Sequence, residues 1–211
     1  MESNDLASSL VDSFTDFDSA QITPDWVELA LDHVLDDGII KDIPIFRSIV
    51  GVVNAATSIR DRALVKKIVG FLFSLNSVSP EIRKQFKEKL DADEKFRNKI
   101  GEKLLLVIDR LDDMDKPRLI ASAFQAFMEE KIDFDIFQRL ASAIDKTFYV
   151  DLMSPKLTRF PNGLSPQAKL ELANSGIIEL ESTPSINLSS RNNQYQITDL
   201  GRALLKFVLK Q

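Results

Sequence analysis

Residues 90–113 read LDADEKFRNKIGEKLLLVIDRLDD, and the spacing of their apolar side chains decides the fold class. These side chains recur at intervals of three or four, which places them on one face of an α-helix of about twenty residues. Asp91, with Glu94 three residues later, resembles a capping box and is expected to begin the helix. The side chains expected to be buried are Phe96, Ile100, Leu104, Val107 and Leu111.

Helix-start signals recur on both sides of this segment. Thr23 and Ser79 each precede a proline, and Asp115 and Asp133 each precede an apolar-periodic run. Proline is favoured in the first helical turn, and Ser, Thr and Asp cap the free N–H groups there. We therefore predict a mainly α protein whose residues 23–152 form a multi-helix bundle.

The composition changes at SPKLTRFPNGLSP, residues 154–166, which contains three prolines and one glycine. We place a linker at 153–163 because such a cluster interrupts regular structure. Residues 164–211 then indicate a helix that Ser165 begins, a strand, a turn-rich segment at 183–193, a second strand and a final helix that Thr198 caps. This order matches the second half of a winged helix, so the sequence predicts a small winged-helix-like α+β module.

The N-terminal residues are strongly acidic. Residues 1–42 hold eleven acids and one base, a local balance of −10, whereas the whole chain has a net charge of −5. Residues 1–22 lack a sustained helical pattern, so we expect a mobile, solvated arm. An intramolecular cover for a basic surface is the alternative.

Residues 42–61 read DIPIFRSIVGVVNAATSIRD and carry a single charge, Arg47, between Asp42 and Arg60. A membrane-spanning helix needs about twenty predominantly apolar residues, and the seventeen residues between these two charges include several polar ones. A central bundle helix is the favoured interpretation, and a conditionally inserting segment and an oligomer seam stay open. The seam would use the small side chains of one helix face, because small residues allow close helix approach.

A basic run follows this stretch directly. It can be a solvated helix face or a docking surface for an acidic partner or an anionic membrane. The candidate partner-contact residues combine the small face and the basic run: Ser48, Gly51, Ala55, Ser58, Arg60, Arg62, Lys66 and Lys67.

No combination of residues identifies a reaction. The chain has no cysteine, one histidine at His33 and seven scattered glycines, so thiol chemistry and known phosphate loops are disfavoured. The acids at 109, 112, 113 and 115 are the one carboxylate group that could bind a divalent cation, with Asp109 and Asp113 on one helix face. We expect no catalytic residue and no cofactor, and keep a metal-dependent enzyme using Asp109 to Asp115 as an alternative.

The C-terminal module raises the possibility of DNA binding. Its first helix carries only Lys169 as a base, and the turn-rich segment carries only Arg191. DNA-binding modules usually place more positive charge against the phosphates. A winged-helix transcription regulator is therefore the first alternative function, ahead of the metal-dependent enzyme, and packing or protein contact is the favoured role of the module.

The runs IPIFRSIVGVVNAATSIRDRALVKKIVGFL, DEKFRNKIGEKLLLVIDRLDDMDKPRLIASAFQAFMEEKIDFDIFQRLASAID, NSGII and YQITDLGRALL resemble a group of uncharacterised bacterial proteins, some encoded near phage-defence genes. The tail is similar to the C-terminal part of abortive-infection alpha-type proteins. This resemblance implies a bacterial helical protein with a role in phage defence, and it assigns no functional residue. With no secretory leader at the N-terminus, we expect a cytoplasmic, non-enzymatic interaction protein that binds a protein partner, forms an oligomer or contacts a membrane without being integral to it.

Overall fold

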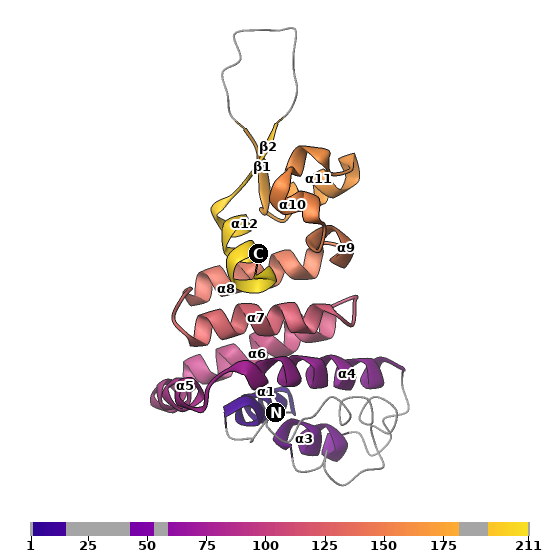
Figure 1. The fold of residues 1–211 in the computed structure, drawn as a ribbon. Helices are drawn as coiled ribbons and strands as arrows, with labels where there is room; N and C mark the ends of the chain where they lie inside the picture. Colours follow the sequence, from indigo (N-terminus) through magenta and orange to yellow (C-terminus); the bar gives the residue numbers. More distant parts are fainter. Residues whose placement is uncertain (1, 16–42, 53–58, 182–193, 211) are drawn as a thin grey trace, which may run out of the picture. The chain divides into compact units, whose positions relative to one another are not determined.

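The computed structural model describes residues 2–15, 43–52, 59–181 and 194–210 (Figure 1). The chain is mainly helical, as predicted, and carries one small two-stranded antiparallel sheet. It divides into two compact units, residues 1–131 and residues 132–211. The predicted linker at 153–163 therefore lies inside the second unit, because helix α8 (Phe134–Lys146) groups with the elements that follow it.

The first unit is a bundle of helices. Its elements are α1 (Glu2–Thr15), α3 (Pro44–Val52), α4 (Ile59–Ser74), the 3₁₀ turn η3 (Leu75–Ser77), α5 (Pro80–Ala92), α6 (Glu94–Arg110) and α7 (Lys116–Met128). Helix α1 packs chiefly on α6 and α3, while α4 packs on α7. The predicted helix at 23–38, including His33, lies outside the described residues.

The structure confirms most of the buried face that the spacing of apolar side chains predicted for α6. Ile100, Leu104, Val107 and Leu111 are buried, whereas Phe96 is only half-buried. The predicted cap was wrong, because α5 continues through residue 92. Asp93 begins α6 by accepting a hydrogen bond from the backbone N–H of Phe96 at 3.0 Å.

The N-terminal segment corrects the expectation of a mobile arm. Residues 2–15 form α1, and its Leu10, Val11 and Phe14 are buried. The Phe14 ring meets Phe124 of α7 edge-on, with ring centroids 5.1 Å apart. Local composition suggested solvation, but α1 instead adds an apolar face to the core formed by later helices.

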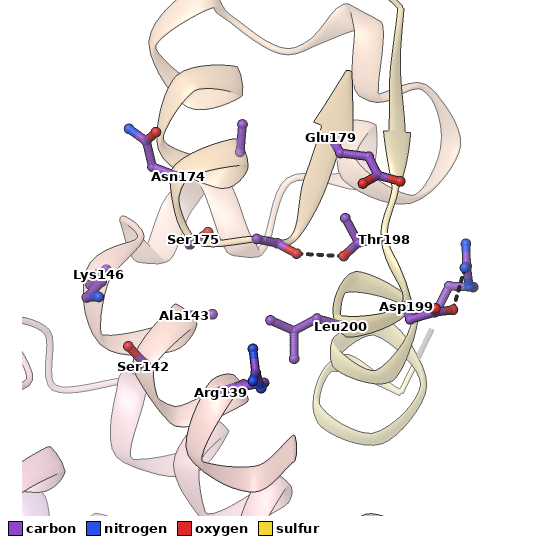
Figure 2. Close-up of a pocket in the computed structure, with 13 residues that line it drawn as sticks. Arg139, Ser142, Ala143, Lys146, Asn174, Ser175, Glu179, Thr198, Asp199 and Leu200 are labelled. Atoms are coloured by element: carbon purple, nitrogen blue, oxygen red, sulfur yellow. Dashed lines mark hydrogen bonds and ion pairs between the residues drawn. The ribbon is translucent and has the colours of Figure 1, made fainter. Parts of the chain in front are cut away.

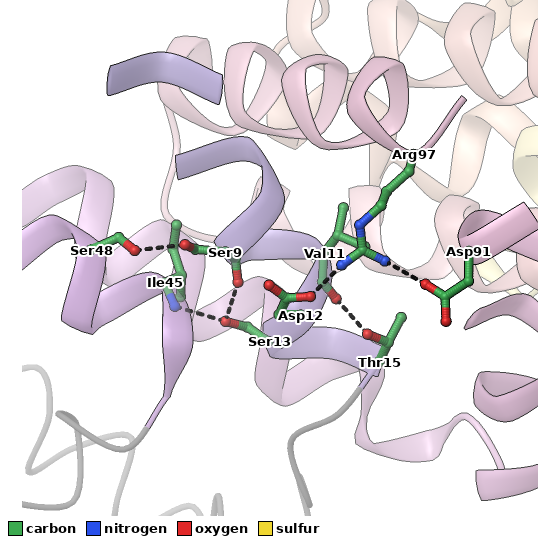
Figure 3. Close-up of polar contacts among 9 residues, drawn as sticks. All are labelled: Ser9, Val11, Asp12, Ser13, Thr15, Ile45, Ser48, Asp91 and Arg97. Atoms are coloured by element: carbon green, nitrogen blue, oxygen red, sulfur yellow. Dashed lines mark hydrogen bonds and ion pairs between the residues drawn. The ribbon is translucent and has the colours of Figure 1, made fainter. Parts of the chain in front are cut away.

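Polar contacts fix α1 on its neighbours (Figure 3). The Ser13 hydroxyl accepts from the backbone N–H of Ile45 at 2.9 Å, which satisfies a donor at the start of α3. Asp12 forms an ion pair with Arg97 of α6, and Arg97 also contacts Asp91 at 3.1 Å. One acidic side chain of the N-terminal segment thus lies against a base of the body, as the intramolecular-cover hypothesis requires at this position.

The second unit combines α8 with short helices and the sheet. Its further elements are α9 (Tyr149–Leu152), α10 (Pro155–Arg159), the 3₁₀ turn η4 (Pro161–Gly163), α11 (Pro166–Asn174), β1 (Ile178–Leu180), β2 (Tyr195–Ile197), α12 (Asp199–Ala203) and the π-helical segment η5 (Leu204–Leu209). The strands pair in the register Ile178 with Ile197. The turn-rich segment at 183–193 lies outside the described residues.

The caps of this unit follow the sequence signals. The hydroxyls of Ser165 and Thr198 accept from the N–H groups of Ala168 and Gly201, at 3.1 and 3.0 Å, and so begin α11 and α12. Gly176 ends α11 with φ at +77°, a conformation that glycine adopts without strain. The two caps and the glycine therefore fix the end of α11 and the start of α12, and these two segments border one surface pocket.

Candidate functional site

A pocket of about 510 Å³ opens on the surface of the second unit (Figure 2). Helix α8 forms one wall, and the end of α11, β1 and the start of α12 form the rest. Figure 2 shows Arg139, Ser142 and Lys146 along the same side of α8, facing the pocket. Their spacing of three and four residues puts them on one helix face, opposite the side that buries Phe137 and Leu140.

The α8 wall is rich in hydrogen-bond donors. Arg139 pairs through Nε with Asp135 at 2.7 Å, and this hydrogen bond and charge raise the pKa of Arg139, which stays cationic. The terminal nitrogens of Arg139 are the donors it offers to a ligand. Lys146 is exposed and has no ion-pair partner among the described residues.

On the facing wall, the charged side chains already have hydrogen-bond partners within the chain. Arg202 donates to the backbone oxygen of Ile197 at 2.8 Å and to Asp199 at 2.5 Å. Glu179 accepts from the side-chain amide of Gln196 at 3.0 Å. The charges of Arg202 and Asp199 cancel one another. The remaining charge of the pocket lining is therefore positive along α8 and negative at Glu179.

Apolar atoms lie between these charged groups. Leu200 projects into the pocket in Figure 2, and Ala143 lies on α8 across from it. The Thr198 hydroxyl donates to the backbone oxygen of Gly176 at 2.6 Å, which joins the start of α12 to the end of α11. The pocket can therefore hold a chain with an apolar centre and a negatively charged edge along α8.

The partner-contact residues predicted from the sequence lie in the first unit, and part of that set is used within the chain. The Ser48 hydroxyl lies 2.6 Å from that of Ser9 in α1 (Figure 3). At this position, the small face predicted for α3 thus packs on its own chain. Gly51 lies within α3, whereas Ala55 and Ser58 lie outside the described residues.

The basic run is also partly engaged. Arg60 forms an ion pair with Asp109 at 2.7 Å, and the pKa of Arg60 is raised by this hydrogen bond and charge. Lys67 is buried and donates to the backbone oxygen of Asp109 at 2.8 Å. Arg62 is exposed and Lys66 is half-buried on α4.

The predicted carboxylate cluster does not converge. Besides the Arg60 contact of Asp109, Asp112 pairs with Lys116 at 2.5 Å, and Asp113 accepts from the backbone N–H of Asp115 at 2.7 Å. Helix α6 ends at residue 110, so Asp109 and Asp113 do not share a helix face as predicted. Across the described ranges, no three His, Cys, Asp or Glu side chains are grouped so that they could hold a metal ion.

Lys116 also sets the protonation of its partner. Desolvation opposes ionisation of Asp112, but the hydrogen bond and charge of Lys116, together with a backbone hydrogen bond and the charge of Lys67, outweigh it and lower the pKa of that carboxyl. Burial, followed by the charge of Glu171, raises the pKa of Asp151 in the second unit. Because the pKa of each acid is shifted in the folded state, each one makes the stability of its own unit depend on pH.

The pocket was missed from the sequence. The spacing of Arg139, Ser142 and Lys146 was a usable signal for the α8 wall, since it marks one polar helix face. The opposite wall comes from residues 173–176, 179 and 198–202, which only the tertiary fold brings close.

Comparison with known proteins adds no relative. No family model, no curated protein and no solved structure matches the chain. Across the described ranges, no helix combines the length and the apolarity needed to cross a bilayer.

Proposed function

We propose that this chain is a non-enzymatic bacterial interaction protein of the cytoplasm that acts by binding a partner protein, as a component of phage defence. The observation that carries the partner-binding role is the pocket of the second unit, whose exposed α8 wall presents Arg139 and Lys146. Charged donors around an apolar centre orient and hold a ligand. The phage-defence role is supported by the sequence resemblance alone.

Exposed apolar side chains on the same unit support a protein as the partner. Phe148, Val150 and Phe160 are 55%, 73% and 61% exposed, and Leu170 is 56% exposed. Protein interfaces are enriched in aromatic residues, and exposed apolar groups gain free energy when a partner covers them.

We further propose that α11, β1, β2 and α12 form a winged-helix-like module used for protein contact. The element order and the antiparallel pairing support this likeness. DNA binding has less support because the one base of α11 and its first amide side chain already have contacts within the chain. Gln167 donates to Glu171 at 2.9 Å, and the Lys169 ammonium lies 5.8 Å from the centre of the Tyr195 ring.

A two-part experiment tests the proposed function. A tagged full-length chain is purified from bacterial cells before and during phage infection, and phage plating is compared with that on cells carrying an empty vector. We expect one protein to co-purify reproducibly and plating efficiency to fall by at least tenfold. Equal plating would overturn the defence role, and the absence of any retained protein above the background of an unrelated tagged protein would overturn the interaction role.

A further inference from the structure

We infer that the pocket of the second unit binds a short acidic segment of a partner protein, with two carboxylates that contact Arg139 and Lys146 and apolar side chains between them. This inference rests on the proposed interaction role and names the chemistry of the partner. The pocket lies within one unit, and its walls come from elements whose mutual contacts the structure defines.

The spacing of the two bases selects the ligand. Arg139 and Lys146 are seven residues apart on α8, which corresponds to about 10 Å along the helix axis. A peptide in the polyproline II conformation has three residues per turn and advances about 3.1 Å per residue, so side chains three positions apart share one face and are separated by about 9 Å. A segment of the form acid, apolar, apolar, acid therefore matches the α8 wall.

The two bases contribute differently. Lys146 has no ion-pair partner among the described residues, so a ligand carboxylate gives its charge a partner that the chain itself does not supply there. Arg139 is already paired with Asp135 through Nε, and it adds directional hydrogen bonds from its terminal nitrogens. Charge reversal should therefore be most damaging at Lys146.

A carboxylate on the opposite wall further limits the class of ligand that the pocket can bind. Glu179 is exposed on β1, and a polyanion that filled the pocket would lie against its carboxylate. Like charges brought together disfavour binding of the wrong partner. The ligand should thus be acidic along the edge that faces α8 and neutral toward β1, which favours a peptide over a nucleic acid.

The test uses the full-length chain and a fluorescein-labelled peptide with the core Glu-Leu-Ala-Glu, titrated by fluorescence anisotropy at low salt. We expect saturable binding that weakens at least tenfold when both glutamates are replaced by glutamine. Lys146→Glu should also weaken it at least tenfold. Lys156→Glu is the matched control, because Lys156 is an exposed lysine of the same unit outside the pocket, and it should change binding less than twofold.

Each outcome separates this inference from the proposed function. Equal binding of the glutamate and glutamine peptides, or an unchanged affinity in Lys146→Glu with a wild-type melting curve, overturns the inference. Tighter binding of a DNA duplex than of the peptide overturns it in favour of nucleic acid. If the co-purified partner is still retained by Lys146→Glu, the pocket assignment fails while the interaction role stands.

Discussion

The substitution Gly101→Ala tests whether α1 packs closely against α6. Gly101 lies inside α6, and a Cβ added there would lie 2.4 Å from the backbone oxygen of Ala7 and 3.1 Å from the Ala7 Cβ. A backbone carbonyl cannot rotate away as a flexible side chain can, so α1 must shift. Overpacking of this kind costs about 1–3 kcal/mol.

Helix propensity acts in the opposite direction. Alanine in a helix interior is favoured over glycine by about 1 kcal/mol. Gly70→Ala in α4 is the matched control, because its Cβ would meet only the Pro117 Cβ, at the ordinary contact distance of 3.8 Å. We expect Gly70→Ala to stabilise the protein by about 0.5–1 kcal/mol, and Gly101→Ala to be less stable than this control by about 1–3 kcal/mol.

The assay is urea unfolding followed by circular dichroism, with hydrogen exchange of the peptide that covers residues 2–15 as a local readout. Gly101→Ala should lower the unfolding midpoint relative to Gly70→Ala and speed exchange in α1. If Gly101→Ala instead stabilises the protein as much as Gly70→Ala does, and exchange in α1 is unchanged, then α1 is not packed against residue 101 and the reasoning is refuted.

Three further predictions concern stability. Phe14→Ala removes a ring from the aromatic core and should lower the free energy of unfolding by about 3–5 kcal/mol, measured by urea unfolding; a loss below about 1 kcal/mol would contradict the packing of α1. Asp112→Ala deprives Lys116, whose side chain is 1% exposed, of an ionic partner and should cost about 1–3 kcal/mol at pH 7, whereas an unchanged midpoint would show that the ion pair contributes nothing. Asp151→Asn should raise the melting temperature at pH 7. The raised pKa of Asp151 means that the folded state holds this proton more tightly than the unfolded state, so wild-type stability falls as pH rises from about 4 through the folded pKa. The stability of the variant should change less with pH, and identical pH profiles would contradict the assigned effect of burial and Glu171.

Local signals in the sequence were sufficient where a helix end depends on its own residues. Ser79, Asp133, Ser165 and Thr198 each cap a helix as their sequence context suggested. Asp91 shows the limit of this reasoning, because Asp93, two residues later, is the acid that accepts from a first-turn N–H group of α6. Cap chemistry alone did not distinguish the two acids.

Long-range contacts explain what the sequence did not reveal. Residues 1–22 are acidic and weakly patterned, yet Asp12 pairs with Arg97, 85 residues away, and Phe14 reaches the aromatic core. The pocket has the same origin, since α8 supplies a recognisable polar face but residues 173–176, Glu179 and the start of α12 complete it. Neither the packing of α1 nor the pocket can be recognised from a periodic pattern in the local sequence.

The most direct test of partner binding at the pocket is site-specific photo-crosslinking in infected bacterial cells. A photoreactive p-benzoylphenylalanine replaces Ser142, on the α8 wall of the pocket, or the exposed Lys156 outside it. We expect one discrete adduct, formed from position 142 and not from 156, that an excess of the Glu-Leu-Ala-Glu peptide suppresses. Equal labelling from both positions, or no adduct from position 142 while a partner still co-purifies, would contradict it.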